Sequence, residues 1–141
     1  MTQIRVRDAA AFLGVSDDTV RRWIEKGRLE AATDASGRTV LEGLDVARLA
    51  RENAVTPQLD GGGLSSARNQ FVGLVTRVVL DTVMAQVEMQ CGPLRVVSLM
   101  SSEAARELGL EPGTVARAMV KATQVVIEAP GPAVVESGSR A

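Results

Sequence analysis

Two short segments of the chain place small hydroxyl side chains next to a single cation. The first is Ser66-Ala67-Arg68-Asn69, and the second, about fifty positions later, is Val120-Lys121-Ala122-Thr123. Each adjoins a stretch rich in valine, so each is expected at the end of a β-strand. Hydroxyl groups, backbone N–H groups and a fixed cation together form the charge-assisted hydrogen bonds that hold a tetrahedral oxyanion. The two segments therefore predict an oxyanion-binding site.

The composition narrows the possible classes of protein. With 141 residues, 45% of them hydrophobic, the chain can form two small domains or one of ordinary size. No apolar run approaches the roughly 18 residues of a membrane span, and no signal-like segment opens the chain, so we expect a cytoplasmic protein. Cys91 is the only cysteine and there is no histidine. We therefore expect no disulfide within the chain, no metal-cation site and no enzymatic activity.

Proline and glycine mark a boundary near the middle of the chain. Residues 55–63 contain Pro57 and three consecutive glycines, which neither a helix nor a strand accommodates cheaply. We interpret this segment as a linker between a domain at 1–54 and a second at 64–128. Most side chains in residues 129–141 are small, and the segment contains two prolines and few large apolar groups. We therefore predict a disordered tail.

The sequence of the first domain predicts two helices, a hairpin and a third helix. Gly14 is suited to ending the first helix, and Ser16 is a good N-cap for a second helix that runs to about Lys26. Asp34-Ala35-Ser36-Gly37 predicts a turn between two short strands, which would form a small wing. Residues 44–53 are amphipathic and predict the third helix. The apolar positions assigned to the first two helices are Ala9, Phe12, Leu13, Val20, Trp23 and Ile24.

This arrangement resembles a known class of DNA-binding domain. The Leu13-Gly14-Val15-Ser16 turn, followed by Thr19-Val20-Arg21-Arg22-Trp23-Ile24, is similar to the winged helix-turn-helix of the MerR and excisionase group. The resemblance implies that the second helix reads the major groove while the wing touches the DNA backbone. By position, the residues that would face DNA are Thr19, Arg21, Arg22 and Lys26, with Arg38 in the wing.

The absence of net charge in this domain predicts weak binding to DNA. Residues 1–54 carry nine basic and nine acidic side chains, including Asp17 and Asp18 at the start of the second helix. Non-specific affinity depends on the number of phosphates neutralised, so a single domain is expected to bind weakly and two or more would have to act together. The alternative is a domain that contacts another protein and has no DNA function.

The second domain is predicted to be rich in β-structure. We expect strands at 69–81, 83–90 and 94–100, a short helix at 103–108, and one or two further strands within 115–127. Five strands with one short helix describe a small barrel of the oligonucleotide-binding type, so the predicted fold class is α+β in two domains. Phe71 is the only aromatic residue after the linker, which argues against the base stacking that single-stranded nucleic acid requires.

The same segments resemble the molybdate-binding Mop or TOBE domain over residues 64–128. The resemblance rests on Ser66-Ala67-Arg68-Asn69-Gln70, the 98–101 stretch, the Leu108-to-Gly113 turn and Val120-Lys121-Ala122-Thr123. It implies that domains pair by exchanging strands and that molybdate or tungstate binds where subunits meet. The implied ligands are the side chains of Ser66, Arg68, Ser101, Lys121 and Thr123, and the backbone N–H groups of Ala67 and Ala122. Ala104 stands where some relatives place a further serine.

These observations predict a molybdate- or tungstate-responsive transcription regulator. Its partners would be double-stranded DNA, the oxyanion and further copies of the same chain, as a dimer or hexamer. Occupancy would change the assembly and thereby the spacing of the DNA-binding domains. The alternative is an oxyanion storage or homeostasis protein whose first domain does not bind DNA.

Overall fold

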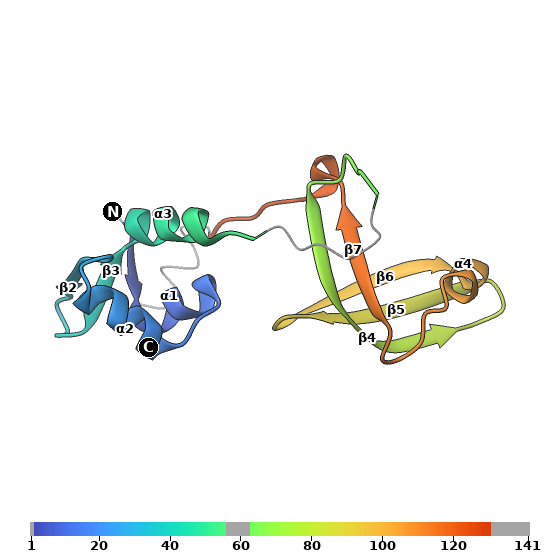
Figure 1. Ribbon diagram of the computed structural model, residues 1–141, viewed down its shortest axis with the longest axis horizontal. Helices are drawn as coiled ribbons and strands as arrows, with labels where there is room; N and C mark the ends of the chain where they lie inside the picture. The colour runs from blue at the N-terminus through green and yellow to red at the C-terminus, as the bar shows by residue number, and fades with distance from the viewer. Residues whose placement is uncertain (1, 56–62, 131–141) are drawn as a thin grey trace. The chain divides into compact units, whose positions relative to one another are not determined.

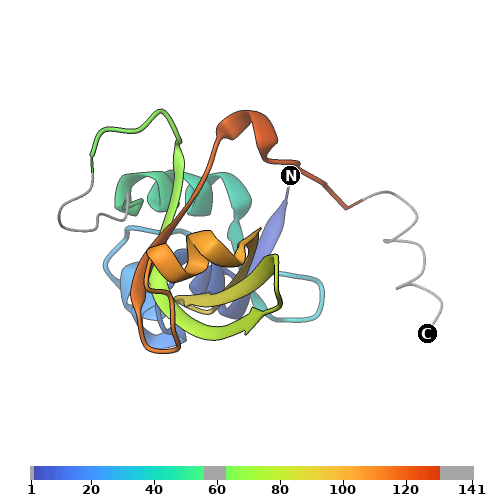
Figure 2. The same cartoon turned by 90° about the vertical axis from the view of Figure 1, so that its right-hand side faces the viewer.

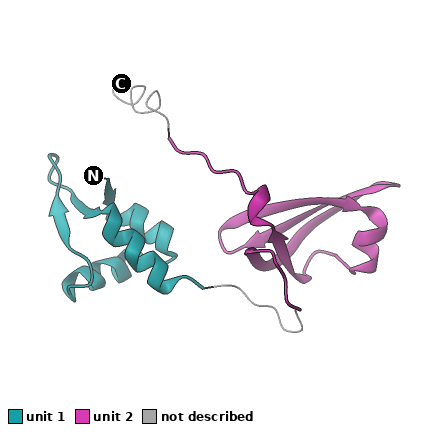
Figure 3. Ribbon diagram, turned by 90° about the horizontal axis from the view of Figure 1, so that it is seen from above, with its two compact units in different colours: residues 1–55 teal, residues 56–141 magenta. Residues whose placement is uncertain are grey.

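The computed structural model describes residues 2–55 and 63–130 of the chain. It divides the chain into two compact units, Met1–Val55 and Thr56–Ala141, which are coloured separately in Figure 3. Most of the predicted linker, residues 56–62, and most of the predicted tail, residues 131–141, lie outside the described residues. Within the described ranges, no helix has the length and apolar character needed to cross a membrane.

The N-terminal unit combines three helices with a small antiparallel sheet (Figure 1). Its elements in chain order are β1 Gln3–Arg5, α1 Val6–Leu13, α2 Asp17–Glu25, β2 Ala31–Thr33, β3 Thr39–Glu42 and α3 Gly43–Asn53. The strand order is β1-β3-β2, with Gln3 opposite Glu42 and Ala31 opposite Leu41. The hairpin of β2 and β3 is the wing that the sequence predicts.

Local signals set the ends of these elements as predicted. Gly14 adopts the left-handed conformation, with φ of 68°, and ends α1. The Ser16 hydroxyl accepts a hydrogen bond from the backbone N–H of Thr19 at 3.2 Å and caps α2. In the wing, the Asp34 carboxylate accepts backbone hydrogen bonds from Ser36 and Arg38, at 2.8 and 2.9 Å. Short-range hydrogen bonds to Ser16 and Asp34 therefore hold the start of α2 and the turn of the wing.

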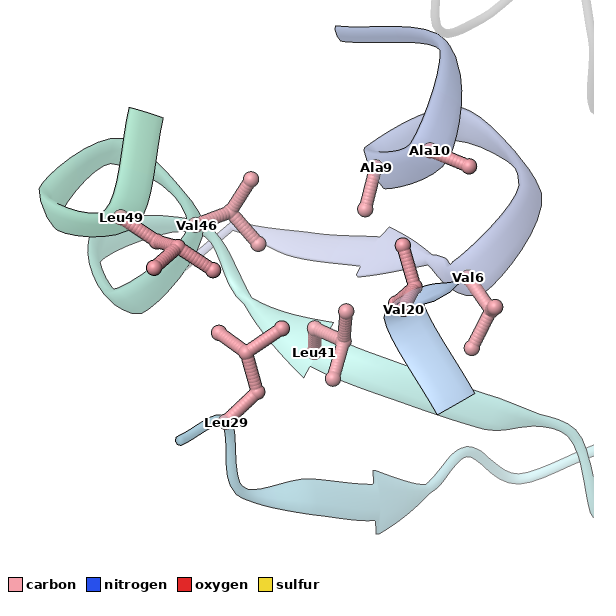
Figure 4. Packing of buried hydrophobic residues seen from close by; sticks show 8 residues of the cluster. All are labelled: Val6, Ala9, Ala10, Val20, Leu29, Leu41, Val46 and Leu49. Atoms are coloured by element: carbon pink, nitrogen blue, oxygen red, sulfur yellow. The ribbon is translucent and has the colours of Figure 1, made fainter. Parts of the chain in front are cut away.

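The core of this unit lies between the helices and the sheet. Figure 4 shows side chains from α1, α2, β3 and α3 converging on one space, together with Leu29 from the α2–β2 connection. Trp23 and Ile24 pack against this cluster, as predicted. Phe12 does not, because its side chain is 73% exposed. The buried face of α1 is formed instead by Val6, Ala9 and Ala10 at i, i+3 and i+4, and Phe12 lies beside that face.

The C-terminal unit is a curled antiparallel sheet with one short helix. Its elements are β4 Asn69–Leu80, β5 Met84–Cys91, β6 Leu94–Ser101, α4 Ser102–Glu107, β7 Val115–Val120 and the 3₁₀ turn η1 Ala122–Gln124. The strand order is β6-β5-β4-β7. The first half of β4 pairs with β7 and the second half pairs with β5. Leu74 pairs with both neighbours, and a β-bulge between Val75 and Arg77 interrupts the pairing with β5.

The two faces of this sheet differ in character. One carries the buried side chains of Val75, Val87, Met89 and Cys91, with Phe71 and Met100 packed against them. The other face carries Glu88, which is 9% exposed and accepts a hydrogen bond from Arg95 at 2.6 Å, with Arg77 at 3.9 Å. Alternation along β5 therefore separates an apolar core from an ion-paired outer surface.

The predicted five-stranded barrel is not what the described residues form. Their sheet has four strands, because residues 115–127 give a single strand, β7, followed by η1. Residues 125–130 are exposed, and Val126 and Ile127 are 84% and 87% exposed. A strand needs a neighbouring edge with which to share hydrogen bonds, and β-propensity alone does not supply one.

Candidate oxyanion site and DNA-binding helix

The two cation-bearing segments lie side by side at one end of the C-terminal sheet. Asn69, the first residue of β4, is paired with Val120, the last residue of β7. The Asn69 side chain also donates a hydrogen bond to the Val120 carbonyl oxygen at 3.3 Å. Since β4 and β7 are antiparallel, Arg68 immediately precedes this pair and Lys121 immediately follows it. The register thus brings together two segments that are about fifty positions apart in the sequence.

The segment before β4 is anchored by its middle residue. Ala67 is 8% exposed, whereas Ser66 and Arg68 on either side of it are exposed. The Ala67 N–H donates to the Ser65 hydroxyl at 3.1 Å, and the Gln70 amide donates to the Ala67 carbonyl oxygen at 3.3 Å. The backbone is therefore tied down on both sides while the hydroxyl and the guanidinium face water.

The segment after β7 turns at once into η1. Lys121 precedes this turn with an extended backbone, and its carbonyl oxygen accepts the Gln124 N–H at 2.9 Å. The N–H groups of Ala122 and Thr123 lie in the first positions of the turn, where no preceding carbonyl of the turn can accept them. Lys121 and Thr123 are exposed. No carboxylate in the described residues lies within ion-pair distance of Arg68 or Lys121.

Ser101 is not near these segments within one chain. It pairs with Met84 at the start of β5, and the adjacent Ala85 pairs with Leu80, the last residue of β4. Ser101 therefore lies at the opposite end of the twelve-residue β4 from Asn69. Figures 1 and 2 show the same separation, with η1 beside the start of β4 and α4 far from both. Within this chain the Ser101 hydroxyl caps α4 by accepting the Ala104 N–H at 3.1 Å.

In the N-terminal unit, most of the residues predicted to face DNA are accessible. Arg21, Arg22 and Lys26 are exposed along or just after α2, and Arg38 is exposed in the wing. Thr19 is only partly exposed, and its hydroxyl is 3.0 Å from the Ser16 hydroxyl, so it belongs to the cap of α2. The four cationic side chains are therefore at the surface, whereas the Thr19 hydroxyl interacts with the residue that caps α2.

Three polar residues in or beside the oxyanion segments form hydrogen bonds that were not predicted from the sequence. Ser65 and Gln70 bond to the backbone of Ala67, and Asn69 bonds across to β7. Asn69 and Gln70 stood in the segment on which the resemblance rests, and Ser65 directly precedes it. A run of polar side chains at the start of a strand was the available signal. Their partners could not be read from it, because each bond depends on the turn or on the strand register.

A helix-turn-helix with a hairpin, followed by an antiparallel sheet with a cation-bearing end, defines a two-domain binding protein. Comparison with known families gives the same division: residues 4–54 match the helix-turn-helix domain and residues 65–127 match the TOBE domain. The chain is 38% identical over 63 residues to molybdenum-pterin-binding protein 3 of Clostridium pasteurianum, covering 44% of this chain and 93% of that protein. The chain therefore belongs to the TOBE-domain family, with a helix-turn-helix domain in front.

Two solved structures are similar to the C-terminal part of the chain. A molybdate-binding protein from Sporomusa ovata shares 30% identity, with a TM-score of 0.46, and the match covers 48% of this chain and 100% of that one. MopII from Clostridium pasteurianum shares 36% identity, with a TM-score of 0.44 and coverage of 47% and 100%. The family matches confirm the two domain types predicted from the sequence, and neither is an enzymatic domain.

Proposed function

We propose that this protein is a molybdate- or tungstate-responsive DNA-binding transcription regulator. The observation that carries the proposal is the pairing of Asn69 with Val120, which puts Arg68 and Lys121 on adjacent chain segments. The TOBE family match and a relative named for molybdenum-pterin binding support an oxyanion ligand for this end of the sheet. The helix-turn-helix match supports DNA as the partner of the N-terminal unit.

The donor set suits a tetrahedral dianion. Arg68 and Lys121 would neutralise its charge, while the hydroxyls of Ser66 and Thr123 would donate hydrogen bonds to its oxygens. The N–H of Ala122 would add a backbone donor. The Ala67 N–H bonds to the Ser65 hydroxyl in this structure, so that hydroxyl would have to give way for Ala67 to contact the ligand. All of these groups are donors, which is the requirement for holding an anion.

We further propose that the site is completed by a second copy of the chain. Ser101 would reach the ligand only from a different copy, because within one chain it lies at the far end of β4. A cavity of about 500 Å³, lined mainly by apolar side chains of β5, β6 and β7, lies open in the single chain. Apolar surface of this kind favours association. Oxyanion binding would then stabilise the assembly, and the assembly would set the spacing of the DNA-binding units.

Storage or homeostasis of the oxyanion is the second candidate function. It is favoured by the equal number of basic and acidic residues in 1–54, which gives the N-terminal unit no net attraction to phosphate. Under this alternative the protein would bind oxyanion and retain no DNA, whereas the regulator would bind both.

Thermal unfolding with added oxyanion tests the ligand assignment. We expect molybdate and tungstate to raise the unfolding temperature in a concentration-dependent way, with sulfate giving a smaller rise. Arg68→Ala and Lys121→Ala should abolish the rise, and Arg48→Ala, which removes a cation from the N-terminal unit, should preserve it. The absence of any rise with the unmodified protein would refute the oxyanion assignment.

Retention of duplex DNA at low salt tests the second half of the proposal. We expect the oxyanion-bound protein to retain duplex DNA and Arg22→Ala to weaken that retention. A protein that binds molybdate and shows no retention of duplex DNA would support storage over regulation. Equal retention by the unmodified protein and by Arg22→Ala would contradict groove contact through α2.

A further inference from the structure

Arg28 has a position fixed by the way in which α2 ends. Gly27 has a φ of 78°, and its N–H donates to the Ile24 carbonyl oxygen at 3.1 Å. The Arg28 N–H donates to the Trp23 carbonyl oxygen at 2.9 Å. This pair of bonds is the Schellman pattern, in which a left-handed glycine folds the chain back against the last helical turn. Arg28 is thereby returned to the side of α2 instead of extending away from it.

The side chain of Arg28 is also restrained. Its guanidinium lies over the indole ring of Trp23, 5.3 Å from the ring centre, within the range of a cation–π interaction. Trp23 packs against the buried core, so its ring is itself held in place. Arg28 is exposed, so a guanidinium held over the ring in this way still presents N–H donors to the solvent. The result is a positioned cation at the surface, with less side-chain entropy to lose on binding.

Trp23 brings this cation next to residues already assigned to DNA. On a helix, residues three or four positions apart are neighbours. Trp23 is four positions after Thr19 and three before Lys26, and Lys26 in turn follows Arg22 by four. Arg28 therefore joins the side of α2 that carries Arg22 and Lys26. Arg28 was not among the residues predicted to face DNA, because it follows the glycine that ends the helix.

We propose that Arg28, held over the ring of Trp23 by a cation–π interaction, is a DNA phosphate-binding residue. The inference rests on the proposed DNA-binding function of the N-terminal unit. Arg28 lies in the connection between α2 and the wing, beyond the helical residues that would enter the groove. A guanidinium there suits the bidentate recognition of a phosphate that runs along the groove edge. Phosphate contact would also help to offset the acidic start of α2.

Salt-dependent binding of the full-length protein tests this assignment. The probe is a fluorescently labelled mixed-sequence duplex, and affinity is measured by anisotropy over a series of KCl concentrations with molybdate present. We expect Arg28→Ala to weaken binding several-fold at low salt and to lower the log–log salt slope by about one for each bound unit. Arg28→Lys should recover part of the affinity, because it keeps the charge and loses the bidentate donor geometry of the guanidinium.

Arg48→Ala is the matched control. Arg48 is also an exposed arginine of the N-terminal unit, and it is paired with Asp45 at 3.8 Å on α3. Its removal should leave the salt slope unchanged. The denaturant midpoint followed by Trp23 fluorescence should be nearly the same in Arg28→Ala, Arg48→Ala and the unmodified protein, which establishes that the N-terminal unit of each is folded.

The only tryptophan of the chain supplies a second measurement. Phosphate arriving beside Arg28 would change the electric field at Trp23, so DNA should alter the tryptophan emission of the unmodified protein and not that of Arg28→Ala. If Arg28→Ala matches Arg48→Ala in affinity and slope while Arg22→Ala is weakened, the Arg28 assignment is wrong and DNA binding stands. If the unmodified protein binds no duplex, the proposed DNA function fails and this inference fails with it.

Discussion

The two units of this protein differ in how completely a single chain buries their apolar side chains. Among the described residues, three exposed large hydrophobic residues belong to the N-terminal unit, namely Phe12, Leu44 and Val55. Fifteen belong to the C-terminal unit. The N-terminal core draws on α1, α2, α3 and the sheet, so each helix has its apolar face covered. The C-terminal sheet has one short helix and leaves an apolar cavity of about 500 Å³ open.

Because of this difference, we expect the stability of the C-terminal unit, and not that of the N-terminal unit, to depend on the association of copies. A self-sufficient core has a stability that is independent of protein concentration, whereas a unit that exposes extensive apolar surface gains stability when copies assemble. Under the proposed function, a ligand at the oxyanion segments would act on the second kind of unit. DNA binding would reside in the first kind, which needs no partner in order to fold.

The largest expected effect is loss of the N-terminal core. Leu41 is 1% exposed at the centre of that core, so Leu41→Ala should lower the free energy of unfolding of this unit by about 2–5 kcal/mol. Trp23 fluorescence reports this unit alone, and far-UV circular dichroism reports both. We expect the fluorescence transition to move to lower denaturant while the oxyanion-bound C-terminal transition keeps its midpoint. A joint shift of both transitions would show that the units are not independent.

A glycine in β4 provides the corresponding test for the C-terminal unit. A methyl group on Gly73 would collide with the backbone carbonyl of Gln90 and would lie 2.6 Å from the sulfur of Cys91. Gly73→Ala should therefore destabilise this unit by about 1–3 kcal/mol, because neither the backbone nor a buried thiol can move aside easily. Denaturation followed by circular dichroism should show the loss, with the Trp23 transition unchanged. An unaltered C-terminal midpoint would mean that the strands can separate at this point without cost.

Exposed apolar residues on the two units should differ in their effect on assembly. Ile127 is 87% exposed and Phe12 is 73% exposed, so neither change to aspartate should greatly affect a single chain. We expect Ile127→Asp to raise the concentration at which copies dissociate by about tenfold or more, because a charge would be buried between subunits. Phe12→Asp should leave it unchanged. Sedimentation over a range of concentrations measures both, and the reverse result would place the interface on the N-terminal unit.

The smallest expected effect is a loss of stability of the C-terminal unit at acidic pH. The hydrogen bond from Arg95 holds the pKa of Glu88 below its ordinary 4.5, with burial acting in the opposite direction. A lowered folded-state pKa gives stability that is present above the ordinary value and is lost as pH falls through the folded-state pKa. We therefore expect denaturant midpoints to fall below about pH 4.5 in the unmodified protein and to fall less steeply in Glu88→Gln. The effect is small because the Arg95 side chain is 61% exposed and water screens the pair.

The local features of both units could be predicted from sequence, because each depends on a few neighbouring residues. Gly14 and Gly109 mark helix ends by adopting positive φ, Ser16 and Ser101 cap the helices that follow, and the Asp34 turn makes the wing. The Ser66 and Lys121 segments were assigned to one site between subunits on resemblance, whereas here they are adjacent within one chain. The geometric cause of this adjacency, the Asn69–Val120 pair, required the strand register.

The features that sequence reasoning missed depend on contacts between distant residues. Phe12 was assigned to the core because it follows Ala9 by three, but the buried face of α1 is centred on Val6, Ala9 and Ala10, and Phe12 lies beside it. The fifth strand was expected from the β-branched run after Lys121, but the described residues that follow β7 pair with neither open edge of the sheet, β6 or β7. Ser101 was grouped with the other ligands on resemblance alone, and the register places it at the other end of β4.

At the bulge in β4, the presence of an extra residue matters more for the bend of the strand than the type of its side chain. Thr76 is the extra residue between the Val75–Met89 and Arg77–Glu88 pairs, and its hydroxyl donates to the Glu88 carbonyl oxygen at 3.3 Å. It lies where β4 stops pairing with β7 and pairs only with β5, so it sets the bend between the two halves of the strand. Replacement of Thr76 would keep that bend, whereas its deletion would straighten the strand. Homologues of this unit should therefore tolerate many residue types at position 76 and very few gaps.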